Sequence, residues 1–283
     1  MAGLYYFSRD PILKILKAME RGTGSVRVSL DLNLTLQEFK IQTNRLMLEN
    51  DLAVEREQLE AVAPVEGKIF LFRDQELFPV EVRSGGYYKL VPTQTAPTLE
   101  INGIKMHRSK DIDPLEDARL KAGKIVARGN VVLDTCGGLG YSALAVLRAG
   151  ARKVVSTEKS SEVIQLRSLN PWLTKSRHKD GIDLIHMDIF QYIERLEKDT
   201  FDAILHDPPR FSSATGHLYG KEFYAQLFRV MKPRARLFHY TGSPARVKHG
   251  DRFVKNTVKR LENAGFGKLS FDEQLQGILG MKK

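Results

Sequence analysis

The sequence predicts an α/β protein with a doubly wound, mostly parallel seven-stranded sheet, preceded by a smaller β-rich α+β domain. In the C-terminal two-thirds, short apolar runs alternate with helical patterns, as in parallel strands joined by crossover helices. The first third instead alternates apolar and polar residues over short segments bounded by turns. A chain of 283 residues is long enough for two domains. We place these domains at residues 1–105 and 106–283.

The N-terminal domain combines two short helices with several strands. Residues 10–21 predict an amphipathic helix, with Pro11 in its first turn. Residues 26–34 alternate strictly between apolar and polar, which predicts a half-buried strand, and residues 55–62 predict a second helix. Further strands, forming a small antiparallel meander, are expected at residues 69–72, 77–82 and 87–91.

The C-terminal domain begins with a well-marked helix. Asp113, Pro114 and Glu116 provide an N-cap, a favoured first-turn proline and a capping acid, so we expect a helix to about residue 127. The apolar runs that predict parallel strands lie at residues 131–133, 153–157, 184–186, 203–205 and 237–240. Residues 268–271 and 277–281 predict two more strands, antiparallel to one another at a sheet edge.

Basic residues are concentrated in the C-terminal part of the chain. The net charge is +10; residues 1–110 hold 15 Lys and Arg against 14 Asp and Glu, whereas residues 111–283 hold 29 against 20. The stretch from Arg229 to Lys268 alone carries 11 basic and two acidic residues. This imbalance favours an anionic partner, although the solvated surface of a heat-adapted protein has a similar composition. Because the stretch surrounds the last parallel strand, we expect it to border the carboxyl edge of the sheet.

A glycine-rich turn follows the first strand of the predicted sheet. The sequence Asp134-Thr-Cys-Gly-Gly-Leu-Gly140 leads into a helix that starts at Tyr141. The three glycines allow the backbone to approach a ligand closely, and the helix N-terminus beyond them is electropositive. No Gly-Lys-Ser/Thr follows the turn, which disfavours a phosphate-loop ATPase. A nicotinamide dehydrogenase remains a rival interpretation of the turn alone.

Carboxylates end the following strands of the sheet. Glu158 lies 24 residues after Asp134, where a carboxylate can accept hydrogen bonds from a ribose diol. Asp188 follows the third strand and is placed to meet an adenine amino group. After the fourth strand comes His-Asp-Pro-Pro-Arg-Phe, residues 206–211, at the edge where ligands meet a doubly wound sheet. A dehydrogenase does not explain Asp207-Pro-Pro, whereas a rigid turn without catalysis remains an alternative.

Together these motifs resemble class I S-adenosylmethionine-dependent methyltransferases over essentially all of residues 113–283. The resemblance implies a Rossmann-like methyltransferase fold with S-adenosylmethionine as cofactor: its methionine end at residues 134–140, its ribose at Glu158 and its adenine at Asp188. Cys136 departs from the usual glycine pattern of that family. The cofactor-binding residues that the resemblance implies are Asp134, Cys136, Gly137, Gly138, Gly140, Tyr141, Glu158, Lys159, Asp188 and Ile189.

The second motif is similar to that of RNA base methyltransferases with Asp-Pro-Pro, and the chain also resembles archaeal methyltransferase-like proteins. In amino-group methyltransferases of this kind the acid accepts hydrogen bonds from the target NH2 and the aromatic ring stacks on the base. Arg210 occupies the usual aromatic place, and Phe211 follows it. The resemblance therefore implies Asp207, Pro208, Pro209 and Phe211 as catalytic residues.

Few other residue types offer catalytic groups. The single cysteine, Cys136, lies in the cofactor turn and cannot serve as the nucleophile that methylation at carbon 5 of a pyrimidine requires, so an exocyclic nitrogen is the favoured target. His186, His206 and His239 fall at or near strand ends where a general base could sit, and none stands out. Trp172 is expected to be a packing residue. Tyr141 could line the cofactor pocket, and Lys110, Asp111 and Asp117 could reach the substrate side, although a structural role is the expected one for each.

Composition bounds the location and partners of the protein. No internal disulfide is possible with one cysteine, and no Cys/His cluster has zinc-ligand spacing, so no metal site is predicted. No apolar run of about 18 residues and no signal-peptide pattern occurs, so we expect a soluble cytoplasmic protein that binds no membrane. The oligomeric state does not follow from these features.

Three functions fit these observations. The leading hypothesis is an RNA methyltransferase acting on a base nitrogen of tRNA or rRNA, with Arg229 to Lys268 binding phosphates and the N-terminal domain helping to select the substrate. The second is a methyl- or aminopropyl-transferase acting on a small molecule or a protein side chain. A third is a cofactor-binding RNA module without catalysis.

Overall fold

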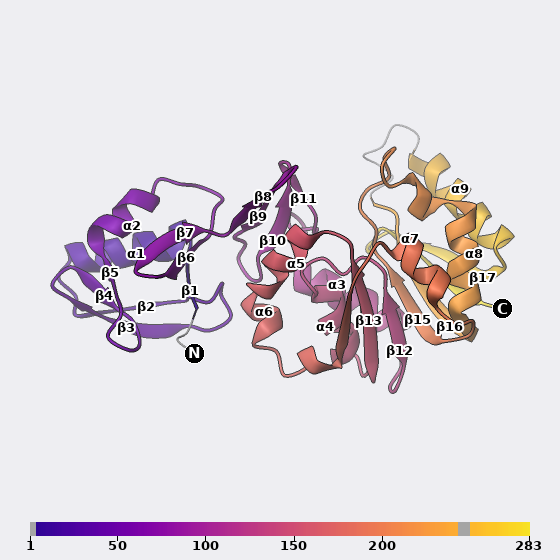
Figure 1. The fold of residues 1–283 in the computed structure, drawn as a ribbon, viewed down its shortest axis with the longest axis horizontal. Helices are drawn as coiled ribbons and strands as arrows, with labels where there is room; N and C mark the ends of the chain where they lie inside the picture. The colour runs from indigo at the N-terminus through magenta and orange to yellow at the C-terminus, as the bar shows by residue number, and fades with distance from the viewer. Residues whose placement is uncertain (1–3, 243–249) are drawn as a thin grey trace. The chain divides into compact units, whose positions relative to one another are not determined.

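The computed structural model describes residues 4–242 and 250–283 (Figure 1). Contacts between residues divide the chain into two compact units. The N-terminal unit comprises Met1–Pro114 and Ser168–Lys175, and the C-terminal unit comprises Leu115–Arg167 and Ser176–Lys283. Residues 168–175 therefore belong to the first unit, although the chain reaches them from the second. The predicted domain boundary between residues 105 and 106 stays a prediction.

The C-terminal unit is built on a seven-stranded sheet with the strand order β14-β13-β12-β15-β16-β18-β17. Its strands are β12 (Val131–Asp134), β13 (Lys153–Glu158), β14 (Ile182–His186), β15 (Phe201–His206), β16 (Met231–Tyr240), β17 (Phe266–Asp272) and β18 (Gly277–Lys282). The first five strands of this order pair in parallel, whereas β18 pairs antiparallel with both β16 and β17. The predicted fold class is confirmed, including the antiparallel pair at one edge.

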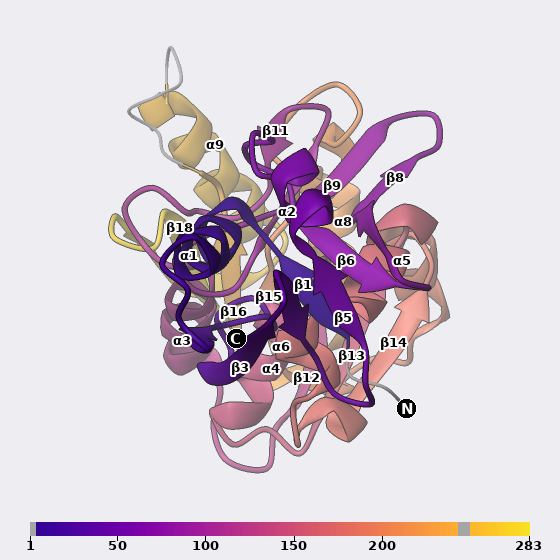
Figure 2. The ribbon, with the colours of Figure 1, turned by 90° about the vertical axis from the view of Figure 1, so that its left-hand side faces the viewer.

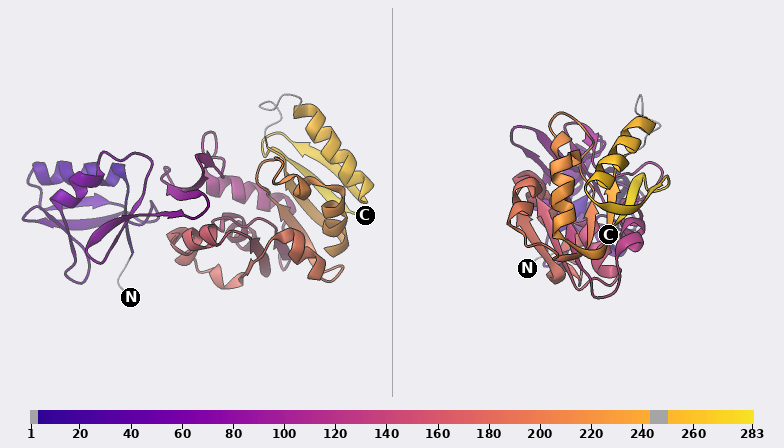
Figure 3. Two further views of the ribbon diagram at one scale, coloured as in Figure 1. Left: turned by 45° about the horizontal axis from the view of Figure 1, so that its top comes forward. Right: turned by 90° about the vertical axis from the view of Figure 1, so that its right-hand side faces the viewer.

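Helices and short 3₁₀ turns connect these strands. They are α3 (Pro114–Ile125), α4 (Tyr141–Arg148), α5 (Ser161–Ser168), η1 (Lys179–Gly181), α7 (Ile189–Tyr192), η2 (Ile193–Arg195), η3 (Gly216–Tyr219), α8 (Lys221–Val230) and α9 (Gly250–Asn263). Helices α8 and α9 contact one another and pack on β16 and β17, and α4 packs on β12 and β13. Figure 3 shows α8 and α9, in orange and yellow, side by side along the sheet. Phe223, Leu227 and Leu261 are fully buried in this core.

The central strands are apolar because both of their faces are covered. Val132 and Leu133 in β12, and Ala203, Ile204 and Leu205 in β15, are fully buried. Parallel pairing aligns the strands so that Asp134 lies opposite Leu205, and His206 opposite His239. The residues that follow β12, β13, β15 and β16 therefore emerge at one edge of the sheet, which we call the carboxyl edge.

The N-terminal unit contains three antiparallel sheets, ordered β1-β6-β7, β2-β3-β4-β5 and β11-β10-β9-β8 (Figure 2). Their strands are β1 (Tyr5–Phe7), β2 (Ser25–Val28), β3 (Gln37–Gln42), β4 (Arg45–Met47), β5 (Ala53–Glu55), β6 (Phe70–Arg73), β7 (Glu76–Pro79), β8 (Glu81–Arg83), β9 (Tyr87–Val91), β10 (Thr98–Ile101) and β11 (Ile104–Lys105). The helices are α1 (Arg9–Glu20), α2 (Arg56–Val62) and α6 (Pro171–Thr174). Ile12, Ile15 and Leu59 from α1 and α2 are fully buried in the core of this unit.

The strand predicted over residues 26–34 is too long. Strand β2 ends at Val28, and Leu32 and Asn33 adopt left-handed backbone conformations with φ of 59° and 66°. The Asp31 carboxylate accepts hydrogen bonds from the Thr35 backbone N–H at 2.9 Å and the Thr35 hydroxyl at 2.7 Å. Burial acts to raise the pKa of Asp31, but these hydrogen bonds outweigh it and the pKa is lowered. A side chain that closes a turn thus interrupts the alternating pattern.

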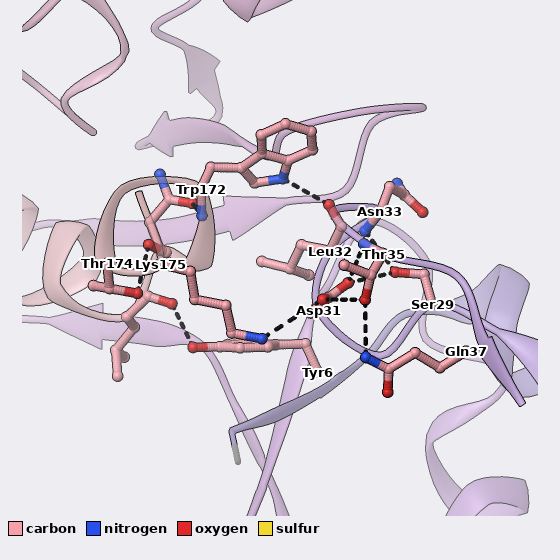
Figure 4. A network of polar contacts seen from close by, with 12 residues as sticks. Tyr6, Ser29, Asp31, Leu32, Asn33, Thr35, Gln37, Trp172, Thr174 and Lys175 are labelled. Carbon is pink, nitrogen blue, oxygen red and sulfur yellow. Dashed lines mark hydrogen bonds and ion pairs between the residues drawn. The ribbon is translucent and has the colours of Figure 1, made fainter. Parts of the chain in front are cut away.

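The same turn holds the segment 168–175 (Figure 4). The Trp172 indole N–H donates to the Leu32 carbonyl at 2.8 Å, and Lys175 forms an ion pair with Asp31 at 3.5 Å. The Tyr6 hydroxyl donates to the carbonyl of Leu169. Trp172 is therefore engaged in structure, in agreement with its interpretation as a packing residue.

Candidate functional site

Asp134 ends β12 in a fully buried position at the carboxyl edge. One carboxylate oxygen accepts hydrogen bonds at 2.9 Å from the hydroxyls of Ser142 and Ser156. The other oxygen is buried and has no hydrogen-bond partner among the described residues. Burial raises the pKa of Asp134 to about 6, against the lowering effects of the two serines and Arg167. A buried acceptor without a partner is costly unless a ligand supplies the donor, so this oxygen fits the ammonium group of a methionine moiety.

The glycine-rich turn that follows is closely packed. A Cβ atom on Gly137 would lie 2.1 Å from the Ser156 hydroxyl oxygen and 2.8 Å from a guanidinium nitrogen of Arg167. Gly138 and Gly140 have positive φ of 47° and 87°, and Gly140 caps the start of α4. Gly137 is thus required by the lack of space for a side chain, and Gly138 and Gly140 are favoured by their backbone conformation.

Tyr141 and Cys136 contribute to this turn from inside the protein. Tyr141 is 2% exposed. Burial raises the pKa of the Cys136 thiol well above its usual value, and the nearby carboxylates of Glu158, Asp134 and Asp207 raise it further. Such a thiol stays protonated and is a poor nucleophile. The structure thus agrees with the argument against a cysteine-dependent methylation of carbon 5.

Glu158 ends β13 beside the turn. Its carboxylate accepts the backbone N–H of Gly138 at 3.1 Å and that of Ser160 at 2.9 Å, one on each oxygen. Each oxygen of a carboxylate can accept more than one hydrogen bond, so an oriented Glu158 fits a ribose diol.

Asp188 caps α7, and its carboxylate accepts the Phe190 backbone N–H at 2.9 Å. Its other oxygen lies 3.6 Å from the ammonium group of Lys159, which is 57% exposed, while Ile189 is buried behind it. The candidate adenine site therefore already contains a neutralising cation, and Asp188 acts partly as a helix cap.

Asp207 follows β15 and forms an ion pair with a buried lysine that the sequence analysis did not select. The Lys121 ammonium lies 2.7 Å from Asp207 and 2.7 Å from Asp117, and its side chain is 4% exposed. It also lies over the ring of Tyr240, 4.3 Å from the centroid. Asp117, expected to be mainly structural, thus belongs to the surroundings of the candidate catalytic acid.

The turn after Asp207 carries an aromatic cluster. Pro208 is buried, whereas Pro209 and Arg210 are exposed. The ring of Phe211 is 55% exposed and lies 5.5 Å from Tyr219 and 5.2 Å from Phe253 of α9, centroid to centroid. The Tyr219 hydroxyl donates to the Pro209 carbonyl at 2.9 Å, and the Thr215 hydroxyl donates to that of Arg210 at 2.7 Å. The exposed ring is therefore held on a well-bonded turn.

His206 and His239 are not placed to act as a general base at this edge. His206 and His239 are fully buried, with ring centroids 4.5 Å apart. Burial lowers the pKa of His206 to about 3 and that of His239 well below its usual value. His206 contacts the Thr135 hydroxyl at 2.7 Å and the Leu218 carbonyl at 3.0 Å, and His239 contacts Tyr224. These neutral rings hold the strands together, and His186 is exposed at the end of β14.

No family model matches the chain. Over 262 residues it is 42% identical to Uncharacterized protein MJ1233 of Methanocaldococcus jannaschii, a match that covers 90% of this chain and 88% of that protein. The chain belongs to that protein's family. It is also 26% identical over 177 residues to ribosomal RNA large subunit methyltransferase I of Aeromonas hydrophila subsp. hydrophila. That match covers 57% of this chain but only 44% of the enzyme.

Solved structures agree on the fold of this family. Spermidine synthase from Thermotoga maritima superposes with a TM-score of 0.55 at 16% identity, covering 72% of each chain. At that identity the likeness concerns the fold alone. The expected methyltransferase class, with S-adenosylmethionine as its cofactor, agrees with the ribosomal RNA methyltransferase among these relatives.

The described residues give no sign of a metal centre or a membrane span. No three His, Cys, Asp or Glu side chains among them lie together as they would around a metal ion. No helix within residues 4–242 and 250–283 has both the length and the apolar character needed to cross a bilayer.

The basic stretch lies only partly at the carboxyl edge. Arg229 donates to the carbonyls of Leu196 and Ile193 at 2.6 and 2.7 Å and is thus occupied inside the unit. Arg236 lies opposite Ala203, three residues before the end of β15, and Arg234 precedes it. The expectation that the whole stretch borders the carboxyl edge is therefore wrong. Arg246 and Lys248 lie outside the described residues.

The raised pKa of Asp134 predicts pH-dependent cofactor binding. A cofactor ammonium favours the ionised carboxylate, so binding should lower this pKa and release a proton. At pH 5 only about a tenth of a group with a pKa near 6 is ionised, so we expect affinity about tenfold weaker at pH 5 than at pH 7. Calorimetric titration with S-adenosylhomocysteine measures this. The Asp134→Asn variant should bind S-adenosylhomocysteine more weakly, and its affinity should not depend on pH. If its affinity still fell between pH 7 and pH 5 as in wild type, the proton would belong to another group.

Proposed function

We propose that this protein methylates a base nitrogen of RNA, with Asp207, Pro208, Pro209 and Phe211 as the catalytic residues. The observation that carries the proposal is the Asp207 carboxylate, anchored by Lys121 beside an exposed ring on the same turn. The ribosomal RNA methyltransferase among the relatives supports RNA as the substrate class. Because the chain spans less than half of that enzyme, the match supports RNA as the substrate class and not a particular RNA.

The cofactor residues proposed are those predicted from the sequence, with Asp134, Gly137 and Glu158 as the principal contacts. S-adenosylmethionine supplies an electrophilic methyl group. Asp207 accepts a hydrogen bond from the target N–H and orients the nitrogen lone pair toward that methyl group. Transfer would form the N–C bond as the C–S bond of the cofactor breaks, and Asp207 or solvent would accept the proton that the nitrogen loses. The carboxylate performs this step without a cysteine or histidine.

Phe211 provides a stacking surface for the target base. An exposed ring held by Tyr219 and Phe253 loses little entropy when a base stacks on it. A base must leave its own stack before an enzyme can reach its amino group, and such a ring compensates for the lost contacts. The turn therefore combines an acceptor for the amino group with a platform for the ring.

We expect Phe211→Ala to raise KM for RNA by about 10- to 100-fold, since base–aromatic stacking contributes about 1–3 kcal/mol per base. Affinity for S-adenosylhomocysteine should stay within about twofold. Leu184→Ala, at a comparably exposed apolar residue of β14 (39% exposed), is the matched control. Equal KM values for the two variants would remove Phe211 from the substrate site.

Helix α9 offers the basic surface next to this turn. Arg252, Lys255 and Lys259 are exposed on the helix that also contributes Phe253 to the aromatic cluster. Neutralising these three residues with glutamine should reduce the slope of log affinity against log salt by about 2–3, because each phosphate contact releases condensed cations. The control neutralises Lys179, Arg195 and Lys198, which are exposed before β14 and β15 at the opposite edge. Equal slopes in both triple variants would place the phosphate contacts elsewhere.

The proposal is tested by transfer of labelled methyl from S-adenosylmethionine to total RNA, with wild type and Asp207→Ala compared, followed by nucleoside analysis. Label in one N-methylated nucleoside, formed only by wild type, is the expected result. Label on carbon 5 of a pyrimidine would overturn the choice of a nitrogen. No label in RNA, with normal cofactor binding, would overturn RNA as substrate.

We also propose residues 1–105 as a domain that helps to select the RNA. Substitutions of exposed residues within that part of the chain, without any deletion, can test this.

Aminopropyl transfer is the second candidate, favoured by the fold shared with spermidine synthase. A polyamine substrate is cationic and needs unneutralised acids around it. Here Asp207 is already paired with Lys121, which opposes a second cation at the same carboxylate. Incubation with decarboxylated S-adenosylmethionine and putrescine distinguishes the two reactions, and we expect no product.

A further inference from the structure

Lys121 is a buried cation that joins helix α3 to the candidate catalytic acid. It lies one turn after Asp117 on the same helix and reaches Asp207, 86 residues away in sequence, with both contacts at 2.7 Å. Its side chain is 4% exposed and that of Asp117 is 8% exposed, whereas that of Asp207 is 28% exposed. Of the two carboxylates, Asp207 is therefore the one open to a substrate.

A buried lysine stays charged only if nearby carboxylates compensate for its loss of solvent. Burial acts to lower the pKa of Lys121, but the charges of Asp207 and Asp117 outweigh it, and the pKa is raised. The ring of Tyr240 adds a cation–π contact at 4.3 Å. Removing the ammonium would take its counter-charge from the buried carboxylate of Asp117, which is strongly destabilising. The ammonium is thus held in one place by groups from three different elements.

We propose that Lys121 is a positioning residue that fixes Asp207 as an oriented carboxylate, and that it restricts the site to neutral nitrogen nucleophiles. This inference rests on the proposed function and deepens it. Lys121 offsets one of the two negative charges of Asp117 and Asp207, so Asp207 gains less from a second cation than it would without Lys121, while it can still accept a hydrogen bond from a neutral amino group. A nucleobase amino group is neutral near pH 7, whereas an alkyl amine is protonated. Lys121 therefore selects aromatic amines and amides over polyamines and lysine side chains.

The geometry separates this role from ordinary surface ion pairing. Two prolines follow Asp207 and stiffen its backbone on one side, while Lys121 holds the carboxylate from the other. The charged or titratable groups that act on this place are Lys121, Asp117, Asp134, Cys136, Tyr219 and Tyr240. Among these groups of the described residues, Lys121 alone carries a positive charge.

The test compares Lys121→Met, Lys121→Arg and the double variant Asp117→Asn/Lys121→Met with wild type. The double variant also removes the buried charge of Asp117, from which Lys121→Met would take its counter-charge, so we expect it to fold even if the single variant does not. Lys124→Met is the matched control, since Lys124 lies on the same helix and pairs with Asp272 at 2.9 Å away from Asp207. S-adenosylhomocysteine binding confirms folding in each case.

We expect both Lys121→Met variants to lose about 100-fold in kcat on RNA with KM nearly unchanged, because a misplaced catalytic group typically has an effect of this size. The acid limb of the pH–rate profile should move upward by about 1 pH unit or more. Lys121→Arg, which keeps the charge, should recover part of kcat and restore the acid limb. Normal kcat and an unchanged acid limb in the double variant would overturn the inference.

A second measurement needs no RNA. Putrescine is titrated into each protein with S-adenosylhomocysteine bound. Wild type, Lys121→Arg and Lys124→Met should bind putrescine more weakly than Lys121→Met, in which Asp117 and Asp207 have lost the ammonium that they share. Putrescine binding by wild type equal to that of Lys121→Met would overturn the selection. If wild type methylates no RNA, the proposed function fails, and this titration still decides whether Lys121 excludes cations.

Discussion

Asp207→Ala is expected to lower kcat/KM for RNA methylation at least ~100-fold, because positioning of the reacting nitrogen and its proton acceptor is lost together. The change removes the carboxylate that Lys121 holds at the carboxyl edge. The other acid paired with Lys121, Asp117, is nearly buried and cannot replace it. Affinity for S-adenosylhomocysteine should change by less than about threefold, because the proposed cofactor contacts follow β12 and β13 and do not include Asp207. Steady-state kinetics with calorimetry separates these two effects.

The control for Asp207→Ala is Asp183→Ala. It breaks an Asp–Lys pair of similar type, between Asp183 on β14 and Lys153 on β13, with a separation of 2.5 Å and half-exposed partners. A surface pair of this kind contributes little, so its activity should stay near wild type. If Asp207→Ala retained more than a tenth of the wild-type rate, the Asp-Pro-Pro turn would be a structural feature and catalysis would reside elsewhere.

Gly137→Ala is expected to weaken cofactor binding at least ~100-fold, since the new methyl group displaces the side chains that arrange Asp134. The added Cβ would lie 2.1 Å from the Ser156 oxygen, which donates to Asp134, and 3.3 Å from the Asp134 carboxylate itself. Ser156 and Arg167 are buried and cannot simply turn away. The free energy of unfolding should also fall by about 1–3 kcal/mol, as overpacked cores typically show.

The control for this variant is Gly123→Ala on α3, where a Cβ would meet nothing within 4 Å. That change should leave cofactor affinity unaltered and stabilise the helix by up to ~1 kcal/mol, because alanine has the higher helix propensity. Isothermal calorimetry and denaturant unfolding of both variants provide the comparison. Wild-type cofactor affinity in Gly137→Ala would mean that the turn does not hold the methionine end.

Much of the sheet could be predicted because its signals are local. Asp134, Glu158 and Asp207 each follow an apolar run, and parallel pairing brings the ends of such runs to one edge. The antiparallel edge pair was also predictable from two apolar segments close in sequence. In the N-terminal part, by contrast, the predicted strand over residues 26–34 failed because Asp31 closes a turn there. Strands β1, β4 and β5 have three residues each and are too short to stand out, whereas β3 has only Phe39 and Ile41 as apolar residues.

The site residues that were missed depend on distant partners. Lys121 and Asp117 are spaced i to i+4, which on a helix usually indicates a weak surface pair. Only the fold brings Asp207 to Lys121 and buries the ammonium group. In the same way, the sequence shows Arg229 only as part of a basic stretch, whereas in the structure its guanidinium group donates to the carbonyls of Leu196 and Ile193.

The interleaving of the two units has a consequence for how the protein is made. The N-terminal unit includes residues 168–175, whose Trp172 and Lys175 bind Leu32 and Asp31. A ribosome must therefore synthesise β12, α4, β13 and α5 before the first unit can complete its contacts. For the same reason, a chain cut before Ser168 would leave the Leu32 carbonyl without its indole partner.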